Sequence, residues 1–87
     1  MNYVLSNHAK EEILKRGISV ELIEEVLQSP NQILVEDGIK IYQSIIFQND
    51  SKYLLRVFVN DNKIPSTIIT VYLTNKILKY YKEFNEN

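Results

Sequence analysis

Residues 39–73 constrain the fold most, because they read as three consecutive β-strands joined by short turns. The expected strands are Ile39–Phe47, Tyr53–Asn60 and Thr67–Leu73. Apolar residues alternate with others along each strand, which is typical of strands with one buried face. The connections hold Asn, Asp, Ser and Pro and are too short for a parallel crossover. The stretch therefore predicts an antiparallel meander.

The alternation divides the side chains of this meander between two faces. We expect one face to be apolar, formed by Ile39, Ile41, Ile45, Phe47, Leu55, Val57, Val59, Ile69, Val71 and Leu73. We expect the other to mix cations, phenols and hydroxyls, from Lys40, Tyr42, Ser44, Arg56, Phe58, Thr70, Tyr72 and Thr74. The second face is the more informative one for function.

The flanking segments predict helices and edge strands around the meander. We expect helices at 8–16 and 20–28, edge strands at Asn2–Leu5 and Gln32–Val35, and a last helix from Asn75 to about Phe84. Ser6 or Asn7 would cap the first helix and Gly17 would end it, while Ser19 caps the second and Pro30 follows its end. The order β-α-α-β-β-β-β-α predicts one α+β domain over residues 1–87, with its helices packed on one face of an antiparallel sheet.

Composition excludes several classes of site and cofactor. The chain has no cysteine and one histidine, so it offers neither disulfides nor a structural zinc site, and a reduced, cytoplasmic compartment is expected. No phosphate loop, dinucleotide fingerprint or zinc-protease motif is present, and we expect no cofactor or metal. No apolar run approaches the roughly 20 residues that span a bilayer, so we expect no membrane partner.

Charge is distributed unevenly along the chain. Residues 1–38 hold three basic and seven acidic side chains, a formal charge of −4. Residues 39–87 hold seven basic and four acidic side chains, a formal charge of +3, and the whole chain has a net charge of −1. Such a chain can present a cationic surface despite its overall acidity, although solvated faces explain the same pattern.

A few side chains on this framework suit acid–base and phosphate chemistry. His8 is a candidate acid or base, or else a packing or capping group at a helix start. Arg16 would clamp a phosphate or pair with Glu12 one turn away. Arg56 lies mid-strand and would bind an anion, stack on a base, or form a cross-strand cation–π pair. Tyr72 is either a proton donor, a stacking platform or a half-buried strand tyrosine.

The last helix adds a basic and aromatic side to this set. Its lysines follow helical spacing at Lys76, Lys79 and Lys82, with Tyr80 beside them. Such a stripe tracks phosphates in some proteins and is a solvated helix face in most. Tyr42, expected beside Arg56 on the polar face, completes the candidate RNA-binding residues Tyr42, Lys76, Lys79 and Tyr80.

With these elements in this order, the chain resembles the RelE/ParE-like superfamily of toxin–antitoxin toxins. More closely, it resembles a family of small, largely uncharacterised bacterial proteins related to that superfamily. The residues that carry the resemblance are His8-Ala9, Arg16-Gly17-Ile18, Pro30 and Ile69-Thr70-Val71-Tyr72. The resemblance covers nearly the whole chain and implies a single RelE/ParE-like domain, residues 1–87, of a bacterial cytoplasmic protein encoded beside a cognate antitoxin.

The resemblance also implies two kinds of activity. RelE-like members cleave mRNA, commonly on the ribosome and without metal, whereas ParE-like members inhibit DNA gyrase by binding. His8 and Arg16 match the motif at the first helix, Tyr72 matches the tyrosine of the last strand, and Arg56 is added from its place on the polar face. The mild acidity of this chain departs from RelE-like nucleases, which are usually strongly basic.

We therefore expect the toxin of a type II toxin–antitoxin system that acts as a metal-independent mRNA endoribonuclease. His8 would be its base or acid, and Tyr72 an acid or a stacking group. Arg16 and Arg56 would hold phosphate. An antitoxin segment would cover the sheet face. The alternative is a non-catalytic protein-binding module of the same fold, a ParE-like inhibitor or an inactive homologue. A third option is a homodimer formed through Asn2–Leu5 or Gln32–Val35.

Overall fold

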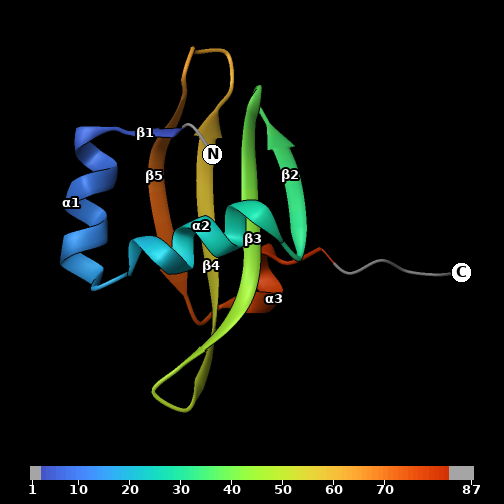
Figure 1. Cartoon of the computed structure of the whole chain (residues 1–87). Coiled ribbons are helices and arrows are strands. Elements are labelled where there is room, and N and C mark those ends of the chain that lie inside the picture. Colours follow the sequence, from blue (N-terminus) through green and yellow to red (C-terminus); the bar gives the residue numbers. More distant parts are fainter. Residues whose placement is uncertain (1–2, 83–87) are drawn as a thin grey trace, which may run out of the picture.

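The computed structural model describes residues 3–82 and has an α+β architecture (Figure 1). Its elements are β1 (Tyr3–Leu5), α1 (Asn7–Arg16), α2 (Val20–Gln28), β2 (Gln32–Glu36), β3 (Ile39–Gln48), β4 (Ser51–Asn60), β5 (Ser66–Thr74) and α3 (Ile77–Tyr80). The predicted order of elements is confirmed, and most bounds lie within one or two residues of those expected. Within residues 3–82, no helix is long and apolar enough to cross a membrane.

The five strands form one mixed sheet in the order β1-β5-β4-β3-β2. The pairs β2–β3, β3–β4 and β4–β5 are antiparallel, as the short connections predict. The prediction of a purely antiparallel sheet is wrong, however, because β1 pairs with β5 in parallel. The chain can make this parallel pair because the connection from β1 to β5 runs through both N-terminal helices and three strands.

Capping residues set the starts of the first two helices and the end of α1. The hydroxyl of Ser6 accepts a hydrogen bond from the backbone N–H of Ala9, and that of Ser19 accepts one from Leu22. Gly17 ends α1 with a φ of +63°, a left-handed conformation that glycine adopts without a steric penalty. Both predicted serine caps are therefore confirmed, with Ser6 rather than Asn7 at the first.

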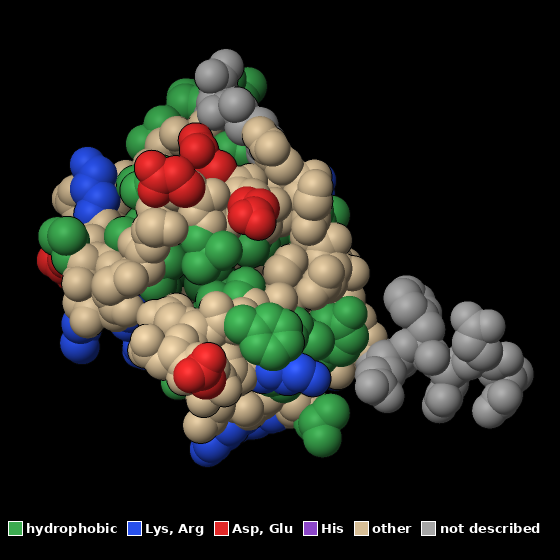
Figure 2. All heavy atoms as spheres, turned by 60° about the horizontal axis from the view of Figure 1, so that its bottom comes forward, with side chains coloured by type: hydrophobic (Ala, Val, Ile, Leu, Met, Phe, Trp, Pro, Cys, Tyr) green, Lys and Arg blue, Asp and Glu red, His purple; other side chains and the backbone are tan. Residues whose placement is uncertain are grey.

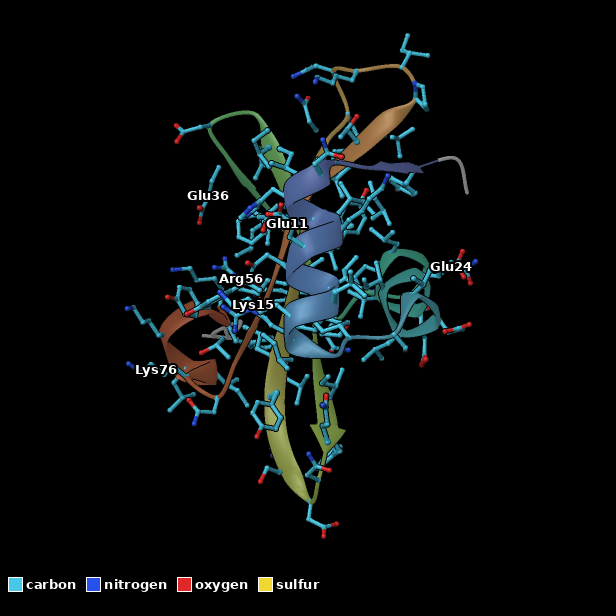
Figure 3. All side chains as sticks on the ribbon, turned by 90° about the vertical axis from the view of Figure 1, so that its left-hand side faces the viewer. Glu11, Lys15, Glu24, Glu36, Arg56 and Lys76 are labelled. Atoms are coloured by element: carbon cyan, nitrogen blue, oxygen red, sulfur yellow. The ribbon has the colours of Figure 1, made fainter. Side chains whose placement is uncertain are left out.

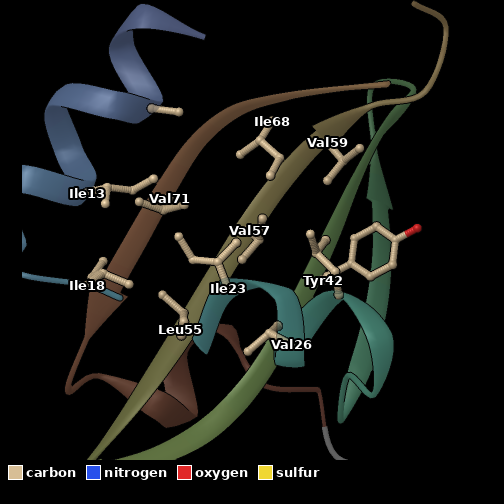
Figure 4. Close-up of a cluster of buried hydrophobic side chains, with 12 residues drawn as sticks. Ile13, Ile18, Ile23, Val26, Tyr42, Leu55, Val57, Val59, Ile68 and Val71 are labelled. Carbon is tan, nitrogen blue, oxygen red and sulfur yellow. The ribbon is translucent and has the colours of Figure 1, made fainter. Parts of the chain in front are cut away.

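The main core lies between α1, α2 and one face of the sheet (Figure 4). The helices contribute buried residues at helical spacing, and the central strand β4 contributes Leu55, Val57 and Val59, each fully buried. On β5 the buried residues are Ile68 and Val71, because a register shift between Phe58 and Val59 places Ile68 rather than Ile69 on this face. The predicted core position of Ile69 is therefore wrong.

The predicted facing of β3 is also wrong. Cross-strand partners share a face, and Tyr42 lies opposite Val57, so Tyr42 belongs to the helix-covered core together with Ser44. Ile41, by the same register, lies opposite Phe58 on the other face. Lys40 and the predicted apolar set of β3 (Ile39, Ile41, Ile45 and Phe47) therefore occupy the faces opposite to those expected.

α3 lies on the side of the sheet opposite α2, so the prediction that all helices pack on one face is wrong (Figure 3). The helix is also shorter than expected and spans only Ile77–Tyr80, with no side-chain cap at its start. Phe84, expected near its end, lies outside the described residues. α3 and the two residues after it thereby reach the polar face around Arg56, which positions the candidate site.

Candidate functional site

Arg56 lies at the centre of the polar face, midway along β4. Its cross-strand neighbours are Gln43 on β3 and Tyr72 on β5. The side chain is 6% exposed, and its Nε donates a 2.9 Å hydrogen bond to Oε1 of Gln43. Burial lowers the pKa of the guanidinium below its ordinary value, an effect that Glu36, Tyr80 and Tyr72 oppose. An arginine nonetheless stays charged at any physiological pH, so a cation is held inside the protein.

Two aromatic rings enclose the guanidinium of Arg56. Its Cζ lies 4.3 Å from the ring centre of Tyr80, which α3 brings across the sheet. It lies 5.2 Å from the ring centre of Phe58, two residues along the same strand. Both contacts are within the range of cation–π attraction, which strengthens where water is excluded. Arg56 thus forms cation–π contacts, but not the predicted cross-strand pair, because Phe58 lies on the same strand and Tyr80 on α3.

Two glutamines fasten the C-terminal segment over this arginine. The side-chain amide of Gln43 donates to Oε1 of Gln32 at 2.8 Å and to the backbone oxygen of Tyr80 at 3.1 Å. Gln32 in turn accepts from the backbone N–H of Lys82 at 3.0 Å and donates to the Lys82 backbone oxygen. Because Gln43 is fully buried, its amide has exchanged water for these partners and for Arg56.

Tyr72 lies beside this pair on β5. Its ring meets the ring of Tyr80 edge to face, with centres 5.8 Å apart and an angle of 85° between planes. Hydrogen bonding to Tyr80 and then to Thr74 lowers the pKa of the Tyr72 phenol, and the ammonium groups of Lys79 and Lys76 lower it further. A phenol surrounded by hydrogen-bond partners and ammonium groups is a candidate for acid–base chemistry.

Arg16 reaches Tyr72 from the end of α1, which packs along the β5 edge of the sheet (Figure 3). Its Cζ lies 5.7 Å from the Tyr72 ring centre. Its Nε also donates to the Glu12 carboxylate at 2.9 Å, and this contact lowers the pKa of Glu12. The predicted pairing of Arg16 with Glu12 is therefore confirmed, and it exists together with the contact to Tyr72.

The lysines of the C-terminal segment complete a mixed cationic and aromatic surface. Nζ of Lys79 lies 5.4 Å from the Tyr80 ring centre, and the backbone N–H of Lys76 donates to the Thr74 hydroxyl at 3.0 Å. Figure 3 shows Arg56 and Lys76 on one side of the sheet, while Glu24 projects on the side of α2. We call this surface the cationic–aromatic face; its residues are Arg16, Arg56, Tyr72, Lys76, Lys79 and Tyr80.

His8 and Tyr42, two of the predicted site residues, lie away from this face. His8 is exposed near the start of α1, and it precedes Arg16 by eight positions, which correspond to about 12 Å along the helix. Tyr42 belongs to the core on the opposite face. In the core Tyr42 interacts with Tyr3. Burial of Tyr3 and its hydrogen bond to Tyr42 raise the pKa of Tyr3 to about 12. The expected pairing of Tyr42 with Arg56 is therefore wrong.

Sequence reasoning missed the two glutamines that organise the face. Gln43 interrupts the apolar alternation of β3, and this interruption was the one available signal, because a polar residue inside a buried strand requires partners. Gln32 carried no signal, since its partners are the Gln43 side chain on the next strand and backbone groups of Lys82, fifty residues away. Among the described residues, no group of three or more His, Asp or Glu side chains is placed to hold a metal ion.

The charge distribution of the fold leaves this face distinct from the rest of the surface. No lysine or arginine occurs between Gly17 and Ile39, so every charged side chain of α2 and its connections is acidic. In Figure 2, most acidic side chains gather in the upper part of the view, and basic ones lie toward its left and lower edges. The cationic–aromatic face therefore suits anions with flat, stackable groups, which nucleotides combine.

Comparison with known proteins gives a family for the chain. Residues 5–73 match a family described as a domain of unknown function, DUF4258. The matched segment includes Arg16, Gln43, Arg56 and Tyr72, and α3 lies beyond it. No curated protein and no solved structure matches the chain. Because the match extends over most of its length, the chain belongs to the DUF4258 family.

Proposed function

We propose that this protein is the toxin of a type II toxin–antitoxin system, a RelE-like and metal-independent endoribonuclease. The observation that carries the proposal is the meeting of Arg16, Arg56 and Tyr72, from three different elements, on one face. Two of these side chains are cations and the third is a phenol of lowered pKa. RNA cleavage without metal needs such groups beside one phosphate.

The proposed reaction is attack of an RNA 2′-hydroxyl on the adjacent phosphorus. A base removes the hydroxyl proton as the new oxygen–phosphorus bond forms, the bond to the 5′-oxygen breaks, and an acid protonates the leaving oxygen. The products are a 2′,3′-cyclic phosphate and a 5′-hydroxyl. Tyr72 makes one of these two proton transfers and solvent water the other, and Arg16 stabilises the charge that develops on the phosphate. His8 takes no step, because it lies about 12 Å from Arg16 along α1.

Tyr80 and Arg56 serve recognition in this proposal. A tyrosine ring offers a stacking surface to any base, at about 1–3 kcal/mol for each stacked base. Tyr80 presents such a ring above Arg56, with Lys79 beside it to contact phosphate. A cognate antitoxin would cover the same face and keep RNA away. The RelE/ParE-like arrangement of the fold belongs to this proposal, and the order of elements supports it.

One observation favours a second function, that of a non-catalytic protein-binding module such as a ParE-like inhibitor. Arg56 is 6% exposed and contacts Gln43 and two aromatic rings, and Arg16 has a carboxylate partner in Glu12. Cations held in this way stabilise a fold without any substrate. In that case the exposed lysines and Tyr72 would form a contact surface for another protein.

Growth of a bacterial host on induction of this protein alone tests the proposal. We expect arrest with the parent and relief with Arg16→Ala and with Tyr72→Phe, which remove a cation and a hydroxyl at partly exposed positions. Lys10→Ala, on the same helix as Arg16, is the matched control and should leave the arrest unchanged. Normal growth with folded parent protein in the cell would contradict toxicity.

Purified protein then separates the two functions. Incubation with ribosomes and with free RNA in the presence of a chelator should yield fragments that end in 2′,3′-cyclic phosphate, and Tyr72→Phe should slow their formation by about 10²-fold or more. Growth arrest without any such fragments would contradict the nuclease and favour the binding module. Inhibition of gyrase supercoiling in the same preparation would identify the ParE-like alternative.

A further inference from the structure

Within residues 3–82, the strand β2 is the last strand of the sheet on the side away from β1 and pairs with β3 alone (Figure 1). An edge strand presents unpaired backbone groups, and proteins usually protect it with lysine, proline or a bulge. β2 carries none of these, since its residues are Gln32, Ile33, Leu34, Val35 and Glu36 and its register with β3 is uninterrupted. Ile33 and Val35 are moreover 50% and 66% exposed. This edge therefore combines unpaired backbone groups with exposed apolar side chains.

The hairpin geometry defines which backbone groups of β2 point outward. Glu36 and Ile39 close a two-residue turn in which Asp37 and Gly38 both have positive φ, so they form a hydrogen-bonded pair. Hydrogen-bonded and non-hydrogen-bonded pairs alternate along an antiparallel ladder. Counting back from the turn, Leu34 and Gln32 direct their backbone groups to β3, and Ile33 and Val35 direct theirs away from it.

We propose that β2 pairs antiparallel with β2 of a second copy of this chain, around a two-fold axis at Leu34. In this register Ile33 lies opposite Val35 of the second copy, so both outward-facing residues of each strand gain hydrogen-bonded partners. Gln32 lies opposite Glu36, and no like charges face each other. The strand is therefore complementary to itself in shape, hydrogen bonding and charge.

Neighbouring registers do not have this property. Moving the axis to Ile33 would place Val35 opposite Asn31, whose backbone N–H already donates to the Ser44 hydroxyl at 3.0 Å. Moving it to Val35 would place Ile33 opposite Asp37, in the turn. The axis at Leu34 also packs the exposed side chains of Ile33 and Val35 against those of the second copy, on the face that α2 covers. The two sheets would continue as one across the axis.

Sedimentation of the full chain over a concentration series tests this inference. We expect a monomer–dimer equilibrium, because a single strand pair is a small interface. Val35→Lys should raise the dimer dissociation constant by about tenfold or more, because it places a charge on the apolar seam. Ile64→Lys, at a side chain that is 99% exposed in the loop between β4 and β5, should leave that constant unchanged. Circular dichroism of each variant checks that it is folded.

Cross-linking gives a second measurement that reports the register directly. The chain has no cysteine, so a single Leu34→Cys substitution introduces the only thiol. Non-hydrogen-bonded partners have Cα atoms about 4.5 Å apart, within the reach of a disulfide. We expect Leu34→Cys to form a covalent dimer on mild oxidation and Ile64→Cys to remain largely monomeric.

A parent chain that sediments as a monomer at every concentration would overturn the inference, and the edge would then be available to a strand of another protein. A dimer that Val35→Lys leaves intact, and that Leu34→Cys does not cross-link, would place the interface elsewhere and overturn it equally. These outcomes are independent of nuclease activity, because β2 carries no residue of the cationic–aromatic face.

Discussion

The guanidinium carbon of Arg16 on α1 lies 5.7 Å from the centre of the Tyr72 ring on β5. The two residues are distant in the sequence, and they meet because α1 packs along the edge of the sheet that β5 shares with β1. The backbone N–H of Ser6 donates to the Ile68 oxygen at 3.0 Å, and its hydroxyl donates to the Ile69 oxygen at 2.7 Å. These contacts fix the start of α1 on β5 and so direct its other end toward Tyr72.

Arg16 should contribute one phosphate contact to RNA binding. For single strands, each neutralised phosphate steepens the dependence of log affinity on log salt concentration by about 0.7. Arg16→Ala should reduce the measured slope by that amount for a single-stranded RNA, read by fluorescence anisotropy. The exposed Lys10→Ala on the same helix is the control and should leave the slope as it is. An unchanged slope for Arg16→Ala would remove Arg16 from the binding surface.

The ionisation of Tyr72 should depend on its neighbours in a defined order. Tyr80→Phe should raise the pKa of Tyr72, because it removes the largest cause of the lowering, and Lys79→Met should raise it less. A pH titration of ring-labelled tyrosines by NMR measures both shifts. Lys63→Met, a change in a distant loop, provides the reference. A Tyr72 pKa that stays fixed in Tyr80→Phe would exclude the proposed contact.

Gln43 should stabilise the fold through the groups that it satisfies. Gln43→Ala leaves the buried Nε of Arg56 and the backbone oxygen of Tyr80 without their partner. An unsatisfied buried polar group costs about 1–3 kcal/mol, and more when it is charged, so we expect at least this loss in the free energy of unfolding by urea. Gln28→Ala, at an exposed position of α2, should change it by less than about 0.5 kcal/mol.

Tyr3 should make the stability of the fold sensitive to alkaline pH. Its pKa is raised to about 12 from a reference of 10.0, so the folded state holds the phenolic proton more tightly than the unfolded state. The resulting stabilisation is complete below pH 10 and is lost as the pH rises toward 12. Tyr3→Phe should therefore flatten the decline in unfolding free energy over this interval. An identical decline in parent and variant would contradict the raised pKa.

Leu55 should rank among the most costly positions in the core. It is fully buried beneath the helices, so Leu55→Ala should lower the free energy of unfolding by about 2–5 kcal/mol. Leu14→Ala removes the same atoms from a side chain that is 83% exposed and should change that energy by less than about 0.5 kcal/mol. Equal losses at the two positions would be inconsistent with the described core.

Local features of the fold could be predicted from the sequence because their causes are local. The serine caps and the end of α1 at Gly17 each depend on a few adjacent residues. The facing of β3 could not be predicted in this way, since residues 41–44 are buried on both faces. A strand covered on both sides loses the alternation that identifies its inner face.

Long-range features of the site escaped prediction for a different reason. The helical spacing correctly placed Glu12 one turn away from Arg16, but spacing alone did not show that Arg16 also reaches Tyr72. The position of α3 depends on hydrogen bonds between Gln32, Gln43 and backbone groups far along the chain. Such contacts produce no periodic pattern in the sequence, so the position of α3 could not be predicted from it.

The parallel pairing of β1 with β5 also governs the order of events during synthesis. β1 is synthesised before both N-terminal helices and three further strands, and its partner strand begins only at Ser66. Until then α1 has no strand to lie against, and Arg16 and Tyr72 cannot meet. A pair that joins segments so far apart in the chain forms slowly, so the cationic–aromatic face is assembled only late in the folding of each molecule.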